Sequence, residues 1–240
     1  MNVLDRLWDH VYASQPAPPA WVVGVTALAA LLLVLNTASW RLAGQVITIA
    51  HEGGHALVSV LSGRRLEGIR LHADSSGVTY SRGKRRGPGL VLTAAAGYVT
   101  PPLLGAGAAA LLTARHPAAL LWLALVLLAA TFLAVRNAFG ALAVLVTAAG
   151  VFAVSYYASA AVQGGFAYLA AWFLLLGGMR PALELTRRRR GSRSRSSSRS
   201  GLSDADQLAR LTGVSRGVWV TAFVLIATAA LALGARLLIP

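Results

Sequence analysis

The sequence predicts an all-α polytopic membrane protein with about seven transmembrane helices and one short cytoplasmic β-hairpin. Of the 240 residues, 56% are apolar and only 12% are charged, against roughly a quarter in soluble globular domains. The mean hydropathy is +0.63, and the apolar residues form long uninterrupted runs. The composition therefore excludes both an ordinary water-soluble domain and a disordered chain. Cysteine is absent, which also excludes disulfides, thiol nucleophiles and cysteine-ligated metals.

Seven apolar runs are candidates for membrane spans, because a helix that crosses the hydrocarbon core needs about 20 apolar residues. The first two runs are separated only by Arg41, so we expect the boundary between them to be poorly defined by sequence. Tryptophan and tyrosine stand near several ends of the runs, as interfacial aromatic residues do. The predicted spans are residues 21–40, 42–61, 88–114, 118–135, 138–158, 165–179 and 217–238.

The segments between the spans divide the chain into four parts. Residues 1–20 form an N-terminal cytoplasmic segment, and residues 21–186 form a membrane domain. The membrane domain includes a β-hairpin within residues 64–87, where apolar residues flank the turn-forming run from Asp74 to Gly77. Residues 187–201 are an Arg/Ser run without an apolar side chain, which predicts a disordered linker. Residues 202–240 contain a short, capped amphipathic segment and the last span.

The distribution of lysine and arginine predicts the orientation in the cell membrane. With the N-terminus in the cytoplasm and seven spans, 19 of these residues fall inside and 3 outside. We therefore expect a cytoplasmic N-terminus and an outside C-terminus. Because orientation explains the net charge of +14, the sequence predicts the lipid bilayer as a partner and no nucleic acid.

The second predicted span contains the sequence His51-Glu52-Gly53-Gly54-His55, an H-E-x-x-H motif. On a helix, residues four apart lie on one face, so the two imidazoles can reach one metal ion. Glu52 is about 100° around the helix from His51, where it can act on a metal-bound water as general base. Imidazole suits zinc, which in catalytic sites takes three protein ligands and a water molecule. The motif therefore predicts His51 and His55 as zinc ligands and Glu52 as the catalytic residue.

The plainer interpretation of the motif is a set of packed polar residues that stabilises the helix bundle. Each ionisable side chain costs about 2–3 kcal/mol or more to place in a span, so such residues normally have a partner. The two glycines of the motif fit close helix packing, and they also fit space beside an ion for a substrate backbone. Gly97 and Pro101 in the third span are open to the same two interpretations, close packing or a wall of the site.

On the basis of these residues, the sequence resembles the site-2 protease family of intramembrane zinc metalloproteases. Within that family it resembles the bacterial branch of short, membrane-only members. The resemblance covers roughly residues 40–215 and implies peptide-bond hydrolysis at membrane depth. It also implies that the hairpin guides an extended substrate strand by β-augmentation. The matching segments are Ala50–Ala56 with the motif, Gly63, Leu71–Tyr80, Ala95–Pro101 and Ser203–Ala209.

The chain departs from the family pattern at the third metal ligand. Family members usually carry an aspartate for this role in a later span, and no predicted span here contains an aspartate. The nearest similarity is Arg136–Gly140, where Phe139 stands at the expected aspartate position.

Five residues remain candidates for the third ligand, and three of them have a plain structural interpretation. Asp204 fits a helix cap, Asp74 fits a turn former, and His72 fits an exposed strand residue. The candidates are Asn137, Asp204, Asp206, Asp74 and His72.

The favoured function is a zinc metalloendopeptidase that cleaves transmembrane or membrane-proximal segments of a membrane protein substrate. One alternative is a catalytically inactive protease-like membrane protein that binds partner segments, because the third ligand is missing from the spans. Another is a metal transporter that uses the histidine pair, although transporters usually repeat ionisable residues in two halves of the chain. The sequence assigns no substrate-binding residue and no oligomeric state.

Overall fold

The computed structural model describes residues 14–191 and 203–239. Within these residues lie eight helices and one two-stranded antiparallel hairpin, which confirms the expected helical membrane class. The elements are α2 (Ala20–Leu35), α3 (Thr37–Leu61), β1 (Arg65–Leu71), β2 (Gly77–Arg82), α4 (Pro88–Thr113), α5 (Pro117–Ala134), α6 (Ala138–Tyr157), α7 (Ala160–Gly191), α8 (Asp204–Thr212) and α9 (Arg216–Leu238).

Each of the seven predicted spans falls mainly on one helix, although the end of the first span, residues 37–40, belongs to α3, and the helices do not make seven crossings. Among the described residues, five helices are long and apolar enough to cross a membrane, and the bent pair α2 and α3 can make a sixth span. Helix α7 also begins earlier and ends later than the predicted run of 165–179, and its last residues overlap the segment expected to be a linker. Residues 1–13 and 192–202 lie outside the described residues. Most of the predicted N-terminal segment, 1–20, and most of the predicted linker, 187–201, falls on them.

Helices α2 and α3 meet at a bend of 102°, at Asn36 rather than at Arg41. The reason is a helix cap that the apolar pattern does not reveal. The Asn36 side-chain oxygen accepts hydrogen bonds from the backbone amides of Ala38, at 2.8 Å, and Ser39, at 3.2 Å. Asparagine is a strong N-cap residue, so a new helix begins here.

A single arginine from α7 stabilises the bend. The Arg180 guanidinium donates to the Val34 carbonyl, one of the carbonyls that the end of α2 leaves without a helical partner. It also lies over the Trp40 ring, with 4.4 Å between Cζ and the ring centroid. Its Nε atom is 3.2 Å from Glu184 Oε1. A cation at the C-terminus of a helix complements the helix dipole, so the charge is stabilised where it lies.

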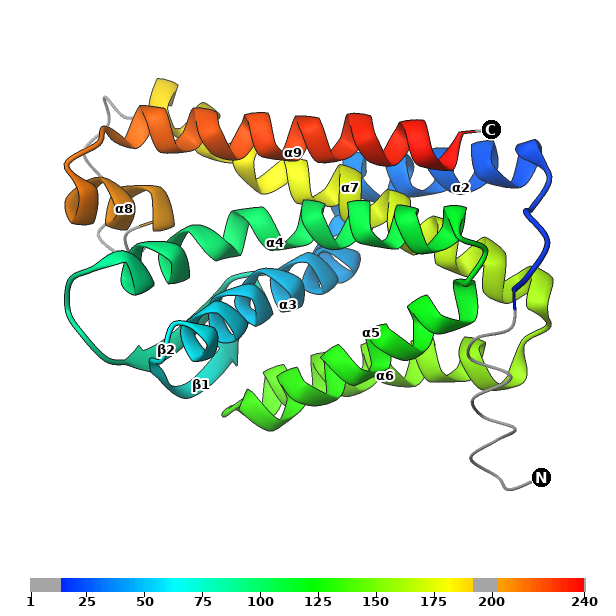
Figure 1. Cartoon of the computed structure of the whole chain (residues 1–240), viewed down its shortest axis with the longest axis horizontal. Helices are drawn as coiled ribbons and strands as arrows, with labels where there is room; N and C mark the ends of the chain where they lie inside the picture. Colours follow the sequence, from blue (N-terminus) through cyan, green and yellow to red (C-terminus); the bar gives the residue numbers. More distant parts are fainter. Residues whose placement is uncertain (1–13, 192–202, 240) are drawn as a thin grey trace.

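Helix α4 is the centre of the bundle and packs against α3, α7 and α9 (Figure 1). Its small residues allow this close approach: the Cβ atom of an alanine at Gly105 would lie 2.8 Å from the Leu175 backbone nitrogen of α7. Pro101 and Pro102 are buried inside α4, next to Gly178 of α7. Helices α5 and α6 pack mainly against each other (Figure 1).

The hairpin lies beside α3 and is sandwiched between that helix and the α5–α6 connection. Antiparallel pairing brings Ile69 opposite Thr79 and Leu71 opposite Gly77. On its other edge, β1 is held by the chain between α5 and α6: the Asn137 amide group donates to the Leu71 carbonyl at 2.8 Å and accepts from the Leu71 amide at 3.1 Å. The backbone amide of Arg136 donates to the Ile69 carbonyl at 2.8 Å.

The hairpin turn reaches back along α3, beyond the motif. The Thr48 hydroxyl of α3 donates to the Ser75 carbonyl at 3.0 Å, and the Gln45 side chain donates to the His72 carbonyl at 3.1 Å. Both α3 residues precede the motif in the chain, whereas the hairpin follows it. The hairpin is therefore a packed part of the membrane domain rather than a loop that projects from it.

The two ends of the bundle differ in what they carry. The hairpin and α8 lie at one end, while α2 begins and α9 ends at the opposite end (Figure 1). This arrangement is the one expected if the bent pair α2 and α3 crosses the membrane only once. The odd number of spans predicted from the sequence came from treating these two helices as separate crossings.

Candidate metal centre

Three side chains from two distant parts of the chain converge on one point. The Nε2 atoms of His51 and His55 are 3.2 Å apart, and each is 3.1 Å from Oδ2 of Asp204. The two histidines lie one turn apart on α3, as predicted, and Asp204 is the first residue of α8. Measured along α3 from its end at Leu61, the pair lies roughly 9–15 Å into the helix, at a rise of 1.5 Å per residue.

The ring of His55 is oriented by a backbone group of α4. Its Nδ1 atom donates to the Thr93 carbonyl at 2.6 Å, so Nε2 is the ring nitrogen that can bind a cation in place of a proton. The His51 ring packs edge-on against Tyr98 of α4, with 4.8 Å between ring centroids. Both imidazoles are thus fixed from the α4 side of the site.

Glycine is required on α4 and α3 for these helices to approach so closely. A Cβ atom at Gly97 would collide with the Nε2 atoms of both His51 and His55. A Cβ atom at Gly54 would collide with the Thr100 hydroxyl. Of the two sequence interpretations, Gly54 fits close helix packing, and Gly97 forms a wall of the site.

Asp204 is positioned by a short helix that is itself firmly packed. Ser203 caps α8 and forms a reciprocal capping box with Asp206, while Ala205 and Leu208 are fully buried, and α8 packs against α4 and α9. Asp206 also pairs with Arg216 of α9 at 3.0 Å. Burial raises the pKa of the Asp204 carboxyl, but the hydrogen bonds to the two imidazoles outweigh it and hold that pKa well below its usual range.

Glu52 lies on the neighbouring face of α3 and is buried. Its Oε2 atom accepts a hydrogen bond from the Thr79 hydroxyl of β2 at 2.7 Å. Glu52 directly follows His51 on α3 and precedes His55 by three residues. An acidic side chain therefore lies beside the cluster without being one of its three converging atoms.

Comparison with protein families identifies the chain. The sequence model described as Peptidase M50B-like, which is the site-2 protease family, matches residues 24–234. The chain belongs to the Peptidase M50B-like family. Comparisons with curated proteins and with solved structures give no match.

The other third-ligand candidates of this M50B-like chain are engaged elsewhere. Asn137 holds β1, and Asp206 bonds to Ser203 and Arg216. Asp74 is a turn former, as its plain interpretation predicts, and hydrogen bonds from the Ser76 hydroxyl and amide lower its pKa. His72 is exposed.

Asp204 is the member of the cluster that the sequence left open, and it is not the helix cap. The capping role belongs to Ser203 with Asp206, three residues later. That spacing is the signal that separates the two aspartates, because it assigns Asp206 to the cap and leaves Asp204 available.

The donor set fits a divalent metal. In a tetrahedral zinc site with ligand distances of about 2.0–2.1 Å, neighbouring ligand atoms lie roughly 3.3–3.4 Å apart. The three atoms here are separated by 3.1–3.2 Å. Within the described residues, this is the single group of three or more His, Asp or Glu side chains that could hold an ion.

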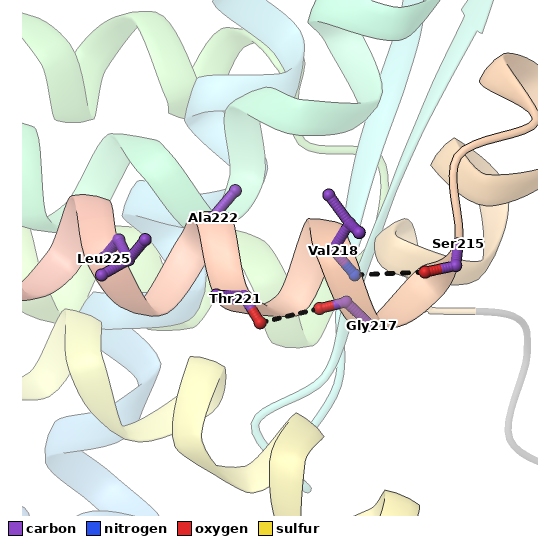
Figure 2. Close-up of a pocket in the computed structure, with 6 residues that line it drawn as sticks. All are labelled: Ser215, Gly217, Val218, Thr221, Ala222 and Leu225. Carbon is purple, nitrogen blue, oxygen red and sulfur yellow. Dashed lines mark hydrogen bonds between the residues drawn. The ribbon is translucent and has the colours of Figure 1, made fainter.

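A shallow pocket on the outer face of α9 is separate from the cluster (Figure 2). It has no titratable side chain, and the hydroxyl of Thr221 is already bonded to the Gly217 carbonyl at 2.9 Å. We assign no function in this M50B-like chain to its lining residues, which are Ser215, Gly217, Val218, Thr221, Ala222 and Leu225.

Proposed function

We propose that the chain is an intramembrane zinc metalloendopeptidase that hydrolyses transmembrane or membrane-proximal segments of membrane proteins. The observation that carries the proposal is the convergence of His51 Nε2, His55 Nε2 and Asp204 Oδ2 within 3.2 Å of one another. Two imidazoles and one carboxylate are a ligand set used by catalytic zinc, which leaves a position for water.

The side chains have separate roles in this proposal. His51, His55 and Asp204 would hold the ion, which when bound would lower the pKa of a water molecule towards about 7 and polarise the scissile carbonyl. Glu52 accepts the proton of the attacking water and then gives it to the leaving amine. The Thr93 carbonyl keeps His55 in the tautomer that presents Nε2 to the ion.

The alternative of an inactive relative was motivated by the absence of an aspartate from the spans. Asp204 now supplies a carboxylate from outside them, so that motive is removed. A transporter is also less favoured, because the described residues contain one such cluster rather than a repeated pair.

The outer edge of β2 is where we expect an extended substrate to bind. The backbone groups of Ile69 and Leu71 bond to the Arg136–Asn137 segment and therefore point away from β2. In an antiparallel pair, when one residue directs its N–H and C=O away from the partner strand, the residue opposite does the same. Thr79 and Gly77 therefore direct their backbone groups to the free edge of β2. A substrate strand added at this edge would run beside Glu52, and it would expose the carbonyls that a helix hides.

We propose that the hairpin end of the bundle faces the cytoplasm, because lysine and arginine gather in the segments at this end. The C-terminus of α9 then lies outside, as expected from the sequence. If α2 and α3 cross once, α2 also begins on the outside, whereas the charge count with seven spans placed the N-terminus inside. The charge bias hardly distinguishes these cases, since residues 1–20 contain one arginine. Protease accessibility of a tag at each terminus distinguishes an N-terminus on the inside from one on the outside.

Cleavage of a library of internally quenched decapeptides in detergent tests the proposed activity without knowledge of the substrate. We expect zinc-dependent cleavage by the wild-type protein and none by Glu52→Gln, while both proteins bind zinc equally. The Glu52→Gln variant is the matched control because it keeps the shape of the side chain and removes the base. Equal cleavage by the two proteins, or cleavage that survives zinc chelation, would refute the proposal.

A further inference from the structure

The face of β2 that points towards α3 contacts the Glu52 carboxylate. The Thr79 hydroxyl lies 2.7 Å from Glu52 Oε2 and 3.1 Å from the Glu52 carbonyl oxygen. A hydroxyl has one proton to donate, and the shorter contact, to a charged acceptor, is the stronger of the two. Thr79 therefore holds one carboxylate oxygen in place.

Gly77 leaves room for the rest of the same carboxylate. Residues two apart on a strand face the same side, so Gly77 and Thr79 both face Glu52. A Cβ atom at Gly77 would lie 2.7 Å from Glu52 Oε1 and 2.6 Å from Cγ, closer than real Cβ contacts. The oxygen that Thr79 does not bind thus lies beside a residue without a side chain.

The strand that carries this hydroxyl is firmly held. The hairpin is bonded to the α5–α6 connection through Asn137 and to α3 through Thr48 at its turn. Ile69 and Leu71, on the partner strand, are fully buried. A donor on such a support can restrict the rotation of a carboxylate, as the groups around metal ligands do for their ligands.

We propose that Thr79 is a positioning residue for the general base: its hydroxyl fixes Oε2 of Glu52 and so keeps Oε1 free to take the proton from the attacking water. The inference rests on the proposed protease function. It links one face of β2 to its outer edge, because the strand that orients the base with its side chains is the strand to which the substrate backbone is expected to add.

Thr79→Val tests the inference, because valine has nearly the shape of threonine and lacks the hydroxyl. We expect kcat to fall about 10–100-fold, the range found when supporting hydrogen bonds of a metal site are removed. KM and the zinc affinity stay close to the wild-type values, since the Thr79 hydroxyl contacts none of the three proposed zinc ligands. Thr79→Ser restores kcat. The control is Thr147→Val on α6, where the hydroxyl donates to the backbone of its own helix.

A spectroscopic measurement examines the contact without any substrate. The chain contains three glutamates, so infrared spectra of protein labelled with ¹³C-glutamate, minus the spectrum of Glu52→Gln, isolate the Glu52 carboxylate band. We expect this band to shift in Thr79→Val and not in Thr79→Ser.

The outcomes separate the two proposals. Absence of peptide cleavage by the wild-type protein refutes the protease function. An unshifted band in Thr79→Val refutes the contact between Thr79 and Glu52. A shifted band with unchanged kcat refutes the positioning role. Equal losses of kcat in the serine and valine variants do the same, because they point to packing rather than to the hydroxyl.

Discussion

Replacement of Asp204 by asparagine is the perturbation that most sharply probes the cluster. Asparagine keeps the size of the side chain but replaces the carboxylate by an amide, which is a poor zinc ligand. In the structure, Oδ2 of Asp204 is equally distant, at 3.1 Å, from the two imidazole nitrogens, so the carboxylate is the shared third corner of the site. The substitution therefore removes one ligand and leaves the histidine pair intact.

The size of the effect follows from the number of ligands. Zinc sites with four protein ligands bind the ion with about 10–16 kcal/mol, or roughly 2.5–4 kcal/mol for each ligand. Since 1.4 kcal/mol corresponds to a factor of ten, the loss of Asp204 should weaken zinc binding roughly 10²–10³-fold. A structural role confined to the N-terminus of α8 would instead change stability and leave this affinity nearly untouched.

Competition with a chromophoric chelator measures the affinity in detergent. The protein should be purified without a histidine tag, and the absence of cysteine removes the commonest competing ligand. Asp74→Asn is the matched control, because it removes the same charge from the hairpin turn, where the carboxylate bonds to Ser76. If Asp204→Asn binds zinc as tightly as Asp74→Asn and the wild-type protein, Asp204 is not a ligand and the site must be completed by another group.

Three further changes probe the surroundings of the site. Gly97→Ala should abolish zinc binding because its Cβ atom would meet both imidazole nitrogens, whereas Gly107→Ala, on the same helix with open space around it, should bind zinc normally in the same titration. Asn137→Ala should speed hydrogen exchange of the Leu71 amide about tenfold, since the loss of one hydrogen bond costs about 1 kcal/mol or more; unchanged exchange would show that this contact does not hold β1. Arg180→Gln should lower the melting temperature in detergent, because the last carbonyls of α2 lose a charged donor and the Trp40 ring loses its cation, and an unchanged melting temperature would contradict this role at the bend.

The helices and the histidine pair could be predicted because both depend on nearby residues. Long apolar runs predict spans, and a spacing of four on a helix places His51 above His55 whatever surrounds them. The bend at Asn36 was missed because a single capping residue interrupts an otherwise continuous apolar pattern. Arg180, which stabilises the bend, lies 146 residues beyond Val34 in the chain.

Asp204 could not be placed from sequence because it meets the histidines only through tertiary packing, 149 residues away from His55. Its position depends on Ala205 and Leu208, whose burial where α8 packs on α4 and α9 brings the start of α8 to the cluster. Local pattern predicts the short capped helix but not which helix it packs on. The contact between Thr79 and Glu52 likewise depends on where the hairpin packs rather than on its own sequence.

X-ray absorption at the zinc edge, on the zinc-loaded protein, reports directly whether His51, His55 and Asp204 bind the ion. We expect one ion per chain with two imidazole nitrogens and oxygen ligands at about 2.0–2.2 Å, and loss of one oxygen ligand in Asp204→Asn. Zinc that does not bind, or that binds with no imidazole in its coordination shell, would contradict this expectation.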